Sequence, residues 1–495
     1  MYDEWLVGRL KVLPKKGDLS DPNSWRGIML LDAAGKILSS IISDRLQDLL
    51  AEEGMEAQCG FTRGRGCSDG SFSLRMALQK RREHDLESWV LFVDLVKAFD
   101  TVDRGGMVEV LRKFGVPNHL CSLITRLHTN CSVKLKVGDT DIQFDSTIGV
   151  KQGDNLAPIL FLFMMQAVME TLEPIWPAAQ LEFRTQDQGR VQGQIWGTQG
   201  RVFKFWASLY ADDAGLVVGS RQELEACVPV LHAHLKRFGM LMHVGSAAKK
   251  SKTEAMFCPR PGQAYDDADT SDVTADDVGG VVSFTASFKY LGSLIDNCLR
   301  DNADVHGRVK SAAAAFGALR ESVFGSKRIK LATKKTVYLT LVVNILLYGS
   351  ECWCLTEALL HRLRVFHHHC VRVMLGVRRS AVWRCRIKTA KLLEEMKMET
   401  VDHYISLRKL RWAGHIARMA QDRVPRKFLT SWIRRPRPHG RPQFTFGHSL
   451  NKTLKRAGIS TDFKEWTELA QDRAGWQKLI YQTAKFPPEI RRGGS

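Results

Sequence analysis

The sequence predicts an α+β protein, in which short strands pair locally and helices pack in separate groups. Three observations predict this class. Two apolar runs, FKFWASLY and AGLVVGS, flank a tight turn at Asp212 and Asp213. The run APILFLFMMQAVMETL is apolar enough for a buried helix, and residues 303–375 are mostly helical in their periodicity. Strands followed by a long group of helices favour the α+β class.

The first 90 residues combine basic loops with one amphipathic helix. In AAGKILSSIISDRLQDLLAEEG the helical period predicts one apolar stripe, and Gly54 follows as a stop signal. The stripe contains Ile37, Leu38, Ile41, Ile42, Leu46, Leu49 and Leu50. The run WVLFV then indicates a buried strand ending at Asp94, and we expect the following segment, KAFDTVDRGGMVEVLRKFG, to be helical.

Later segments differ strongly in composition. The acidic stretch YDDADTSDVTADDVGG at 265–280 predicts an exposed loop or insertion, and VVSFTASFKYLGSLID after it is typical of strands. The C-terminal part is basic. Its segment SWIRRPRPHGRPQF is interrupted by prolines, as a linker or extended arm would be.

Length and charge limit the function. A chain of 495 residues predicts two or three structural units. The formal net charge of +19 favours a polyanionic partner, of which nucleic acid is the commonest. The N-terminus lacks the apolar core of a secretory signal, and no later uncharged run is long enough to span a membrane. We therefore expect an intracellular protein, in the nucleus and/or cytoplasm.

The eleven cysteines have no framework spacing and are expected to be reduced. Cys352, Cys354 and Cys370 lie near the histidine run 367–369, so a zinc site is an alternative. The CxC and HHHC spacings match no standard zinc finger, and the surrounding stretch has helical apolar periodicity. We therefore favour ordinary helix positions for these residues.

Three aspartates are candidate metal ligands. Asp212 and Asp213 occupy the tip of the expected hairpin, and a neighbouring strand could bring Asp94 to the same sheet edge. Crowded carboxylates raise one another's pKa, and divalent metal removes that conflict. Two magnesium ions are a standard device for phosphoryl transfer. The hairpin alone leaves an ordinary surface turn equally open, since Asp favours turns.

The surrounding motifs decide between these readings. GFTRGRGCSDG, FVDLVKAFD, VKQGDNLAP, LYADD, KSKTEAMF and FKYLGSLI follow one another in this order. In this the chain resembles a reverse transcriptase of the non-LTR (LINE-type) retrotransposon class, over most of its length. The resemblance implies a right-hand polymerase: fingers and palm with a small antiparallel sheet in 1–300 (with the insertion at about 261–280), a helical thumb in 301–375, and a basic, mostly helical region in 376–495 that binds nucleic acid.

The resemblance also implies the catalytic roles. Asp94, Asp212 and Asp213 would hold two Mg²⁺ ions, with Mn²⁺ as a substitute, while a primer 3′ hydroxyl attacks the α-phosphate of a deoxynucleotide. Lys252 matches the lysine that protonates departing pyrophosphate, although Lys249 and Lys250 compete for that role. Asp100 and Asp103 are expected to be structural, because a terminal Asp can cap a helix.

Further positions match nucleotide and primer contacts. Phe99 corresponds to the aromatic residue that excludes the ribose 2′ hydroxyl, with a core position as its alternative. Gln152 and Gly153 match the segment beside the incoming nucleotide and template, although Asn155 departs from the family pattern. For Arg63 and Arg65, the sequence leaves open which arginine contacts the triphosphate. Tyr290, Leu291 and Gly292 match the primer grip.

The basic C-terminal region adds a mixture of aromatic and cationic residues that could hold single strands by stacking and charge. Its members are Trp412, His415, Trp432, Arg434, Arg435, Arg437 and Arg441. The expected partners are an RNA template, a DNA primer and deoxynucleoside triphosphates. Because the chain opens close to the first family motif, we expect either that it is a fragment of a longer protein or that the endonuclease needed for integration is a separate activity.

Two alternatives remain open from sequence. The fold could belong to an inactive retroelement remnant that binds RNA, or to an intron-encoded, maturase-like protein. The intact aspartates and loop motifs argue against loss of the chemistry, and the tail shows no clear maturase region.

Overall fold

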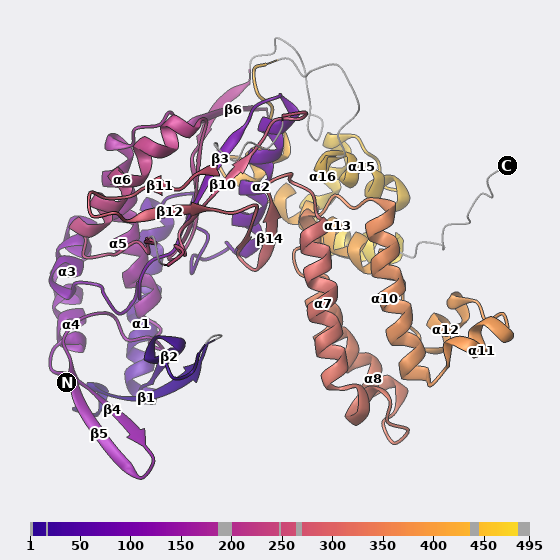
Figure 1. Cartoon of the computed structure of the whole chain (residues 1–495), viewed down its shortest axis with the longest axis horizontal. Coiled ribbons are helices and arrows are strands. Elements are labelled where there is room, and N and C mark those ends of the chain that lie inside the picture. Colours follow the sequence, from indigo (N-terminus) through magenta and orange to yellow (C-terminus); the bar gives the residue numbers. More distant parts are fainter. Residues whose placement is uncertain are drawn as a thin grey trace.

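The computed structural model describes residues 3–15, 18–186, 200–246, 249–263, 270–435 and 445–483. At its centre is a six-stranded sheet of order β11-β12-β10-β3-β9-β8 (Figure 1). In it β3 pairs antiparallel with β9 on one side and with β10 on the other. The strands are β3 (Ser88–Val93), β8 (Ala207–Tyr210), β9 (Asp213–Val218), β10 (Glu254–Cys258), β11 (Val273–Thr274) and β12 (Val281–Phe284).

β3 is buried along its whole length because both faces of the sheet are covered. Side chains alternate between faces in a strand, so Leu91 enters one apolar core and Phe92 the other. The first core contains residues of α1, α3, α4, α5 and α6, and the second contains residues of α2 and of the C-terminal helices. These covering helices are α1 (Ala33–Glu53), α2 (Cys67–Glu83), α3 (Arg104–Lys113), α4 (Asn118–His128), α5 (Ala157–Leu172) and α6 (Arg221–Arg237).

Smaller sheets flank the central one. A four-stranded sheet has the order β2-β1-β4-β5, and two hairpins are formed by β6 with β7 and by β13 with β14. Their strands are β1 (Val7–Pro14), β2 (Trp25–Leu30), β4 (Cys131–Val137), β5 (Thr140–Ser146), β6 (Leu181–Thr185), β7 (Arg201–Phe205), β13 (Ser287–Tyr290) and β14 (Ser293–Asp296). FKFWASLY is therefore not one strand as predicted. It changes partner at Trp206, where β7 ends and β8 begins.

The predicted helical stretch after residue 302 forms a third apolar core around Phe316, Tyr338 and Leu363. It consists of α7 (Asn302–Ala318), α8 (Leu331–Val337), a π-helical turn at Tyr338–Val343, α9 (Asn344–Leu346) and α10 (Glu357–Leu375). Figure 1 shows α7 and α10 on the opposite side of the molecule from β1, β2, β4 and β5.

The C-terminal helices pack on the N-terminal part of the chain. Phe72 of α2 contacts Trp412 of α13 and Phe446 of α15, with ring centroids 5.6 and 5.0 Å apart. The basic region therefore shares a core with the central sheet. Its helices are α11 (Arg379–Arg384), α12 (Thr389–Glu395), α13 (Val401–Ala417), α14 (Val424–Leu429), α15 (Phe446–Arg456), α16 (Phe463–Gln471) and α17 (Arg473–Thr483).

Several expected elements differ in detail. The α1 stripe is narrower than predicted, because Ile37 and Ile41 are 64% and 48% exposed. The helix after Asp94 begins only at Arg104, where the Asp103 side chain caps it by accepting from the Gly106 amide at 2.5 Å. Part of the acidic segment is not a loop: Val273 is buried in β11. Residues 265–269 of that segment lie outside the described residues.

The apolar helix predicted at α5 is a core helix. Together with the turn after it, Ala157–Ile175 is long and apolar enough to cross a membrane, but 61% of this stretch is buried inside the protein. The apolar side chains of α5 are covered by the central sheet and the neighbouring helices.

Candidate active site

Asp94 and Asp213 lie side by side at one edge of the central sheet. Asp94 directly follows β3, Asp213 opens β9, and the adjacent pair Val93 and Ala214 fixes the register of these strands. The Asp94 backbone is held in place, since its amide donates to the Thr253 hydroxyl at 3.1 Å. The predicted approach of these strand ends is confirmed.

Asp212 projects from the turn between β8 and β9. Tyr210 pairs with Asp213, which leaves Ala211 and Asp212 as a two-residue connection. Ala211 has a φ of 54°, the left-handed conformation that such tight hairpins demand. The predicted hairpin is confirmed, and the Gln58 side-chain oxygen accepts the Ala211 amide at 2.8 Å.

The three carboxylates influence one another. Partial burial, followed by repulsion from Asp212 and Asp94, raises the pKa of Asp213 to about 6. Burial also raises the pKa of Asp212, with a further contribution from Asp94 and an opposing one from Arg26. Asp212 and Asp213 therefore become easier to ionise when positive charge enters the site.

The donor set fits hard divalent cations, which prefer carboxylate oxygen. In the described part of the chain, no three His, Cys, Asp or Glu side chains are arranged to hold a metal ion unaided, and this includes the three aspartates. Magnesium sites commonly combine one or two carboxylates with phosphate and water oxygens. The three aspartates correspond to the carboxylate part of such a site.

Two basic side chains flank the aspartates. Lys252 is exposed and lies two residues before Glu254 of β10, which pairs with Phe92 of β3. Continuing this antiparallel register places Lys252 opposite Asp94. Arg26 is exposed on β2, near enough for its charge to act on Asp212. Sequence reasoning missed Arg26. The available signal was a basic residue on a strand of the predicted fingers.

The predicted nucleotide-side residues gather on the elements beside this edge. Phe99 is half-buried and stacks on Phe161 of α5, with centroids 4.5 Å apart, and it lies in a turn instead of the expected helix. The Gln152 carbonyl accepts the Met29 amide of β2 at 2.7 Å. Gly153 has a φ of 113°, and an added Cβ would lie 2.4 Å from the Met29 carbonyl oxygen. This loop therefore requires glycine where it crosses β2.

The structure distinguishes the two candidate arginines. Arg63 is 55% exposed and pairs with Asp44 and Asp48 on α1. Arg65 is 11% exposed, and its guanidinium contacts Glu56 and two backbone carbonyl groups. Arg63 can reach a ligand by leaving a solvated ion pair, whereas Arg65 is held by the fold. The triphosphate contact predicted for either arginine stays a prediction.

The expected primer-grip hairpin contacts the carboxylate hairpin. The Tyr290 hydroxyl is buried and donates to the Ser208 carbonyl of β8 at 2.8 Å. Leu291 and Gly292 form the tip between β13 and β14, and the Leu291 carbonyl accepts the Tyr348 hydroxyl at 2.9 Å. The tip is thus fixed between β8 and the helical part of the chain.

The C-terminal aromatic residues are placed differently from expectation. Trp412 and Trp432 are only 7% and 6% exposed. The prediction that nucleic-acid bases stack on these two side chains is therefore wrong. Trp432 instead pairs its backbone with Arg184 of β6. The exposed members are His415, Arg434 and Arg435, while Arg437 and Arg441 lie outside the described residues.

The cysteine and histidine run forms no metal site among the described residues. The His367 ring lies 2.9 Å from the Tyr338 hydroxyl and 3.1 Å from the Glu399 carbonyl, and Cys370 is buried in the third core. The favoured prediction of helix positions holds for His367 and Cys370 in α10. Cys352 ends a 3-10 turn (Ser350–Cys352), and Cys354 lies in the connection from that turn to α10, so neither residue belongs to the α-helix.

Comparison with known proteins places this arrangement. Residues 13–295 match the reverse transcriptase (RNA-dependent DNA polymerase) family, and this range includes all three aspartates and Lys252. The chain belongs to this family. Its relatives are non-LTR retrotransposon proteins, as the sequence motifs predict. The predicted α+β class is confirmed, since small, mostly antiparallel sheets combine with many helices.

Two relatives illustrate the range of similarity. The Pol polyprotein of the type-1 retrotransposable element R2 of Popillia japonica is 32% identical over 171 residues, covering 34% of this chain and 24% of the relative. The probable RNA-directed DNA polymerase from transposon X-element of Drosophila melanogaster is 22% identical over 457 residues, covering 88% of this chain and 43% of the relative. The matches thus span less than half of these relatives.

Among solved structures, the telomerase of Candida tropicalis with a fragment of telomeric RNA is similar, with a TM-score of 0.41 and 11% identity. The likeness covers 97% of this chain and 64% of the telomerase chain.

Proposed function

We propose that this chain is an RNA-directed DNA polymerase that extends a primer 3′ hydroxyl by two-metal nucleotidyl transfer during retrotransposition. The observation that carries the proposal is the meeting of Asp94, Asp212 and Asp213 at one sheet edge. Asp94 contributes to the raised pKa values of both Asp212 and Asp213, as expected for carboxylates gathered where a cation can bind. Membership of the reverse transcriptase family supports the same chemistry.

The chain's own residues supply position and charge for this reaction. Asp94 and the Asp212–Asp213 pair would hold Mg²⁺ ions, which activate the attacking hydroxyl and stabilise the leaving oxygen. Arg26 and Arg63 would contact the triphosphate, and Lys252 would protonate pyrophosphate. Catalysis of this type depends mostly on positioning and charge neutralisation.

The remaining roles follow from placement. Phe99 would exclude the 2′ hydroxyl, because its ring is fixed against Phe161 and cannot turn away freely. The tip at Leu291 and Gly292 would hold the primer end. The helices from α7 to α10 would form the thumb, and the exposed basic residues of the C-terminal region would contact nucleic acid. The binding-only remnant is the competing function, and catalysis separates the two.

Primer extension on an RNA template with Mg²⁺ and deoxynucleotides tests the proposal. Wild type should extend the primer, whereas a variant carrying Asp212→Ala and Asp213→Ala should lose product while still binding template and primer. Equal product from both proteins would refute the catalytic assignment. Binding without extension by wild type would favour the remnant.

A further inference from the structure

The segment Ala57–Gly60 runs along β8, next to the turn that carries Asp212. The Leu209 amide donates to the Ala57 carbonyl at 2.9 Å, and the Cys59 amide donates to the Leu209 carbonyl at 2.8 Å. This segment therefore acts as one more strand beside the catalytic hairpin.

Within this segment, the Gln58 side chain is devoted to the turn. Its Oε1 accepts the amides of Ala211 at 2.8 Å and Gly60 at 2.9 Å, and its Nε2 lies 3.4 Å from the Ala211 carbonyl oxygen. Gln58 is only 7% exposed. Because a buried amide without a partner costs free energy, this side chain fixes the backbone directly before Asp212.

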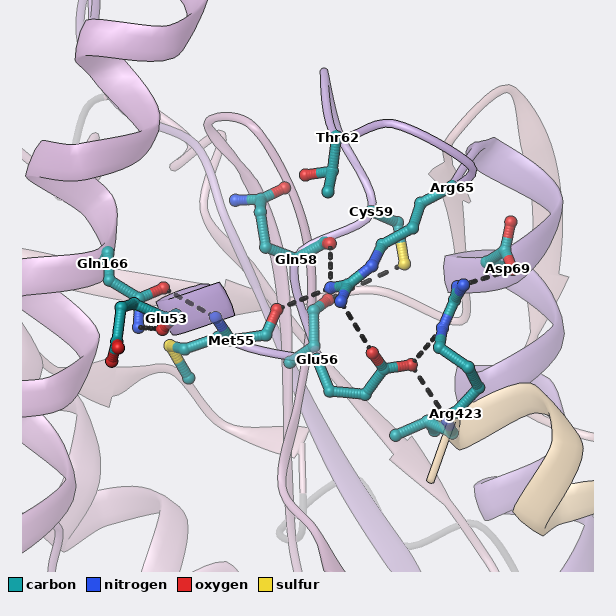
Figure 2. Close-up of polar contacts among 12 residues, drawn as sticks. Glu53, Met55, Glu56, Gln58, Cys59, Thr62, Arg65, Asp69, Gln166 and Arg423 are labelled. Atoms are coloured by element: carbon teal, nitrogen blue, oxygen red, sulfur yellow. Dashed lines mark hydrogen bonds and ion pairs between the residues drawn. The ribbon is translucent and has the colours of Figure 1, made fainter. Parts of the chain in front are cut away.

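Gln58 is in turn fixed by Arg65 (Figure 2). Arg65 Nη1 donates to the carbonyl oxygens of Met55 at 2.7 Å and Gln58 at 2.9 Å. Arg65 Nη2 lies 2.8 Å from Glu56 Oε2. A rigid guanidinium that contacts three points of a four-residue stretch holds its backbone in one conformation.

Glu56 connects this stretch to the C-terminal region. Its Oε1 accepts Arg423 Nε at 2.6 Å and the Val424 amide at 3.0 Å, as Figure 2 shows for Arg423. Arg423 also donates to Asp69 of α2 at 3.2 Å. The Arg423 side chain is 17% exposed and the Asp69 side chain 4%, so water competes weakly with these contacts.

We propose that Gln58 is a positioning residue for the turn that carries Asp212, and that Arg423 controls it through Glu56 and Arg65. The inference rests on the proposed polymerase function. Its consequence is that catalysis depends on a residue more than a hundred positions beyond the family match at 13–295. Arg423 would be needed for turnover although it does not touch substrate.

The test measures kcat and KM in primer extension for Gln58→Met and Arg423→Met. Displacement of a reacting group by about 1 Å can cost about a hundredfold, so we expect kcat to fall by about 10- to 100-fold, with KM values changed less than about threefold. Arg423→Lys should restore part of the loss, because it keeps the charge. If Arg423→Met folds poorly, Glu56→Gln serves as a second variant, because it removes the charge of the carboxylate that pairs with both Arg65 and Arg423.

The matched control is Arg221→Met. The Arg221 side chain is 20% exposed and pairs with Glu225 at 2.8 Å on α6. It also contacts Ser271 and Phe284, which do not belong to the Gln58 segment. Its loss should leave kcat unchanged. If Arg423 acts through Gln58, a Gln58→Met, Arg423→Met double variant should be no slower than Gln58→Met. Losses that multiply would overturn the connection.

Hydrogen exchange separates this inference from the proposed function. Peptides that cover residues 205–216 should exchange faster in Gln58→Met and Arg423→Met than in wild type or Arg221→Met, whether or not the protein extends primers. An inactive wild type with this exchange result would refute the function and keep the positioning role. Unchanged exchange and unchanged kcat in Arg423→Met would overturn the inference.

Discussion

Gly60→Ala is expected to disable the site without touching any aspartate. An added Cβ at Gly60 would lie 2.4 Å from the Ala211 nitrogen and 2.9 Å from the Tyr210 carbonyl carbon. Both contacts are backbone atoms of the catalytic hairpin, so no flexible side chain can turn away. Ordinary contact begins at 3.4 Å, which requires the hairpin to move by 1.0 Å (3.4 − 2.4).

A displacement of about 1 Å next to Asp212 is expected to lower kcat by about a hundredfold. Overpacking of this kind also costs about 1–3 kcal/mol of stability, which leaves most of the protein folded. Single-turnover primer extension measures the catalytic loss, and thermal unfolding measures the stability. Gly317→Ala is the control, since nothing lies within 4 Å of its Cβ position. Full activity of folded Gly60→Ala would refute the reasoning about the turn.

Three further predictions address the site and the charge. The pKa of Asp213 is raised to about 6, so the metal-free folded protein binds more protons than the unfolded chain between pH 3.8 and about 6, and this residue's contribution to stability falls as pH rises. Calorimetry should then show a melting temperature about 2 °C higher for Asp213→Asn than for wild type at pH 7, and no difference at pH 4. Solvent screening keeps this difference small. The same melting temperature for variant and wild type at both pH values would contradict the prediction. Phe99→Ala should raise ribonucleotide incorporation by about tenfold in competition assays, and unchanged sugar selectivity would remove the steric role. RNA binding should weaken by on the order of 10³-fold between about 50 and about 200 mM salt, whereas a flat response would argue against the basic surface as the template path.

The catalytic edge could be predicted because its signals are local. A fully apolar run that ends in Asp94 indicates a buried strand with a polar end, and paired acids between two apolar runs indicate a turn. The order of the motifs resembled that of a known family, and this resemblance implied that Asp94 and the Asp212–Asp213 turn lie close together in the fold. The pairing of β3 with β9 confirms that placement.

The support behind the site could not be predicted in the same way. Gln58 bonds to a turn 153 positions later, and Arg423 to a carboxylate 367 positions earlier. No spacing in the sequence encodes contacts of that range. The sequence left open which of Arg63 and Arg65 can contact a ligand, because a buried and an exposed arginine have the same sequence signature. In the structure the Arg65 guanidinium is buried against backbone carbonyl groups.

The C-terminal tryptophans show the same limit. Basic residues around Trp412 and Trp432 are equally consistent with a nucleic-acid surface and with a core whose rim is charged. The second core decides this, because α13 packs on α2 and removes Trp412 from water. Burial of this kind depends on which helices meet, and that is a property of the tertiary fold.

The most direct measurement is the position of Mn²⁺ in a crystal of the protein with template, primer and an unreactive deoxynucleotide analogue. Anomalous scattering should show two ions about 3.5–4 Å apart, coordinated by Asp94 and the Asp212–Asp213 turn. Ions bound elsewhere, or an empty sheet edge with substrate present, would contradict the two-metal site.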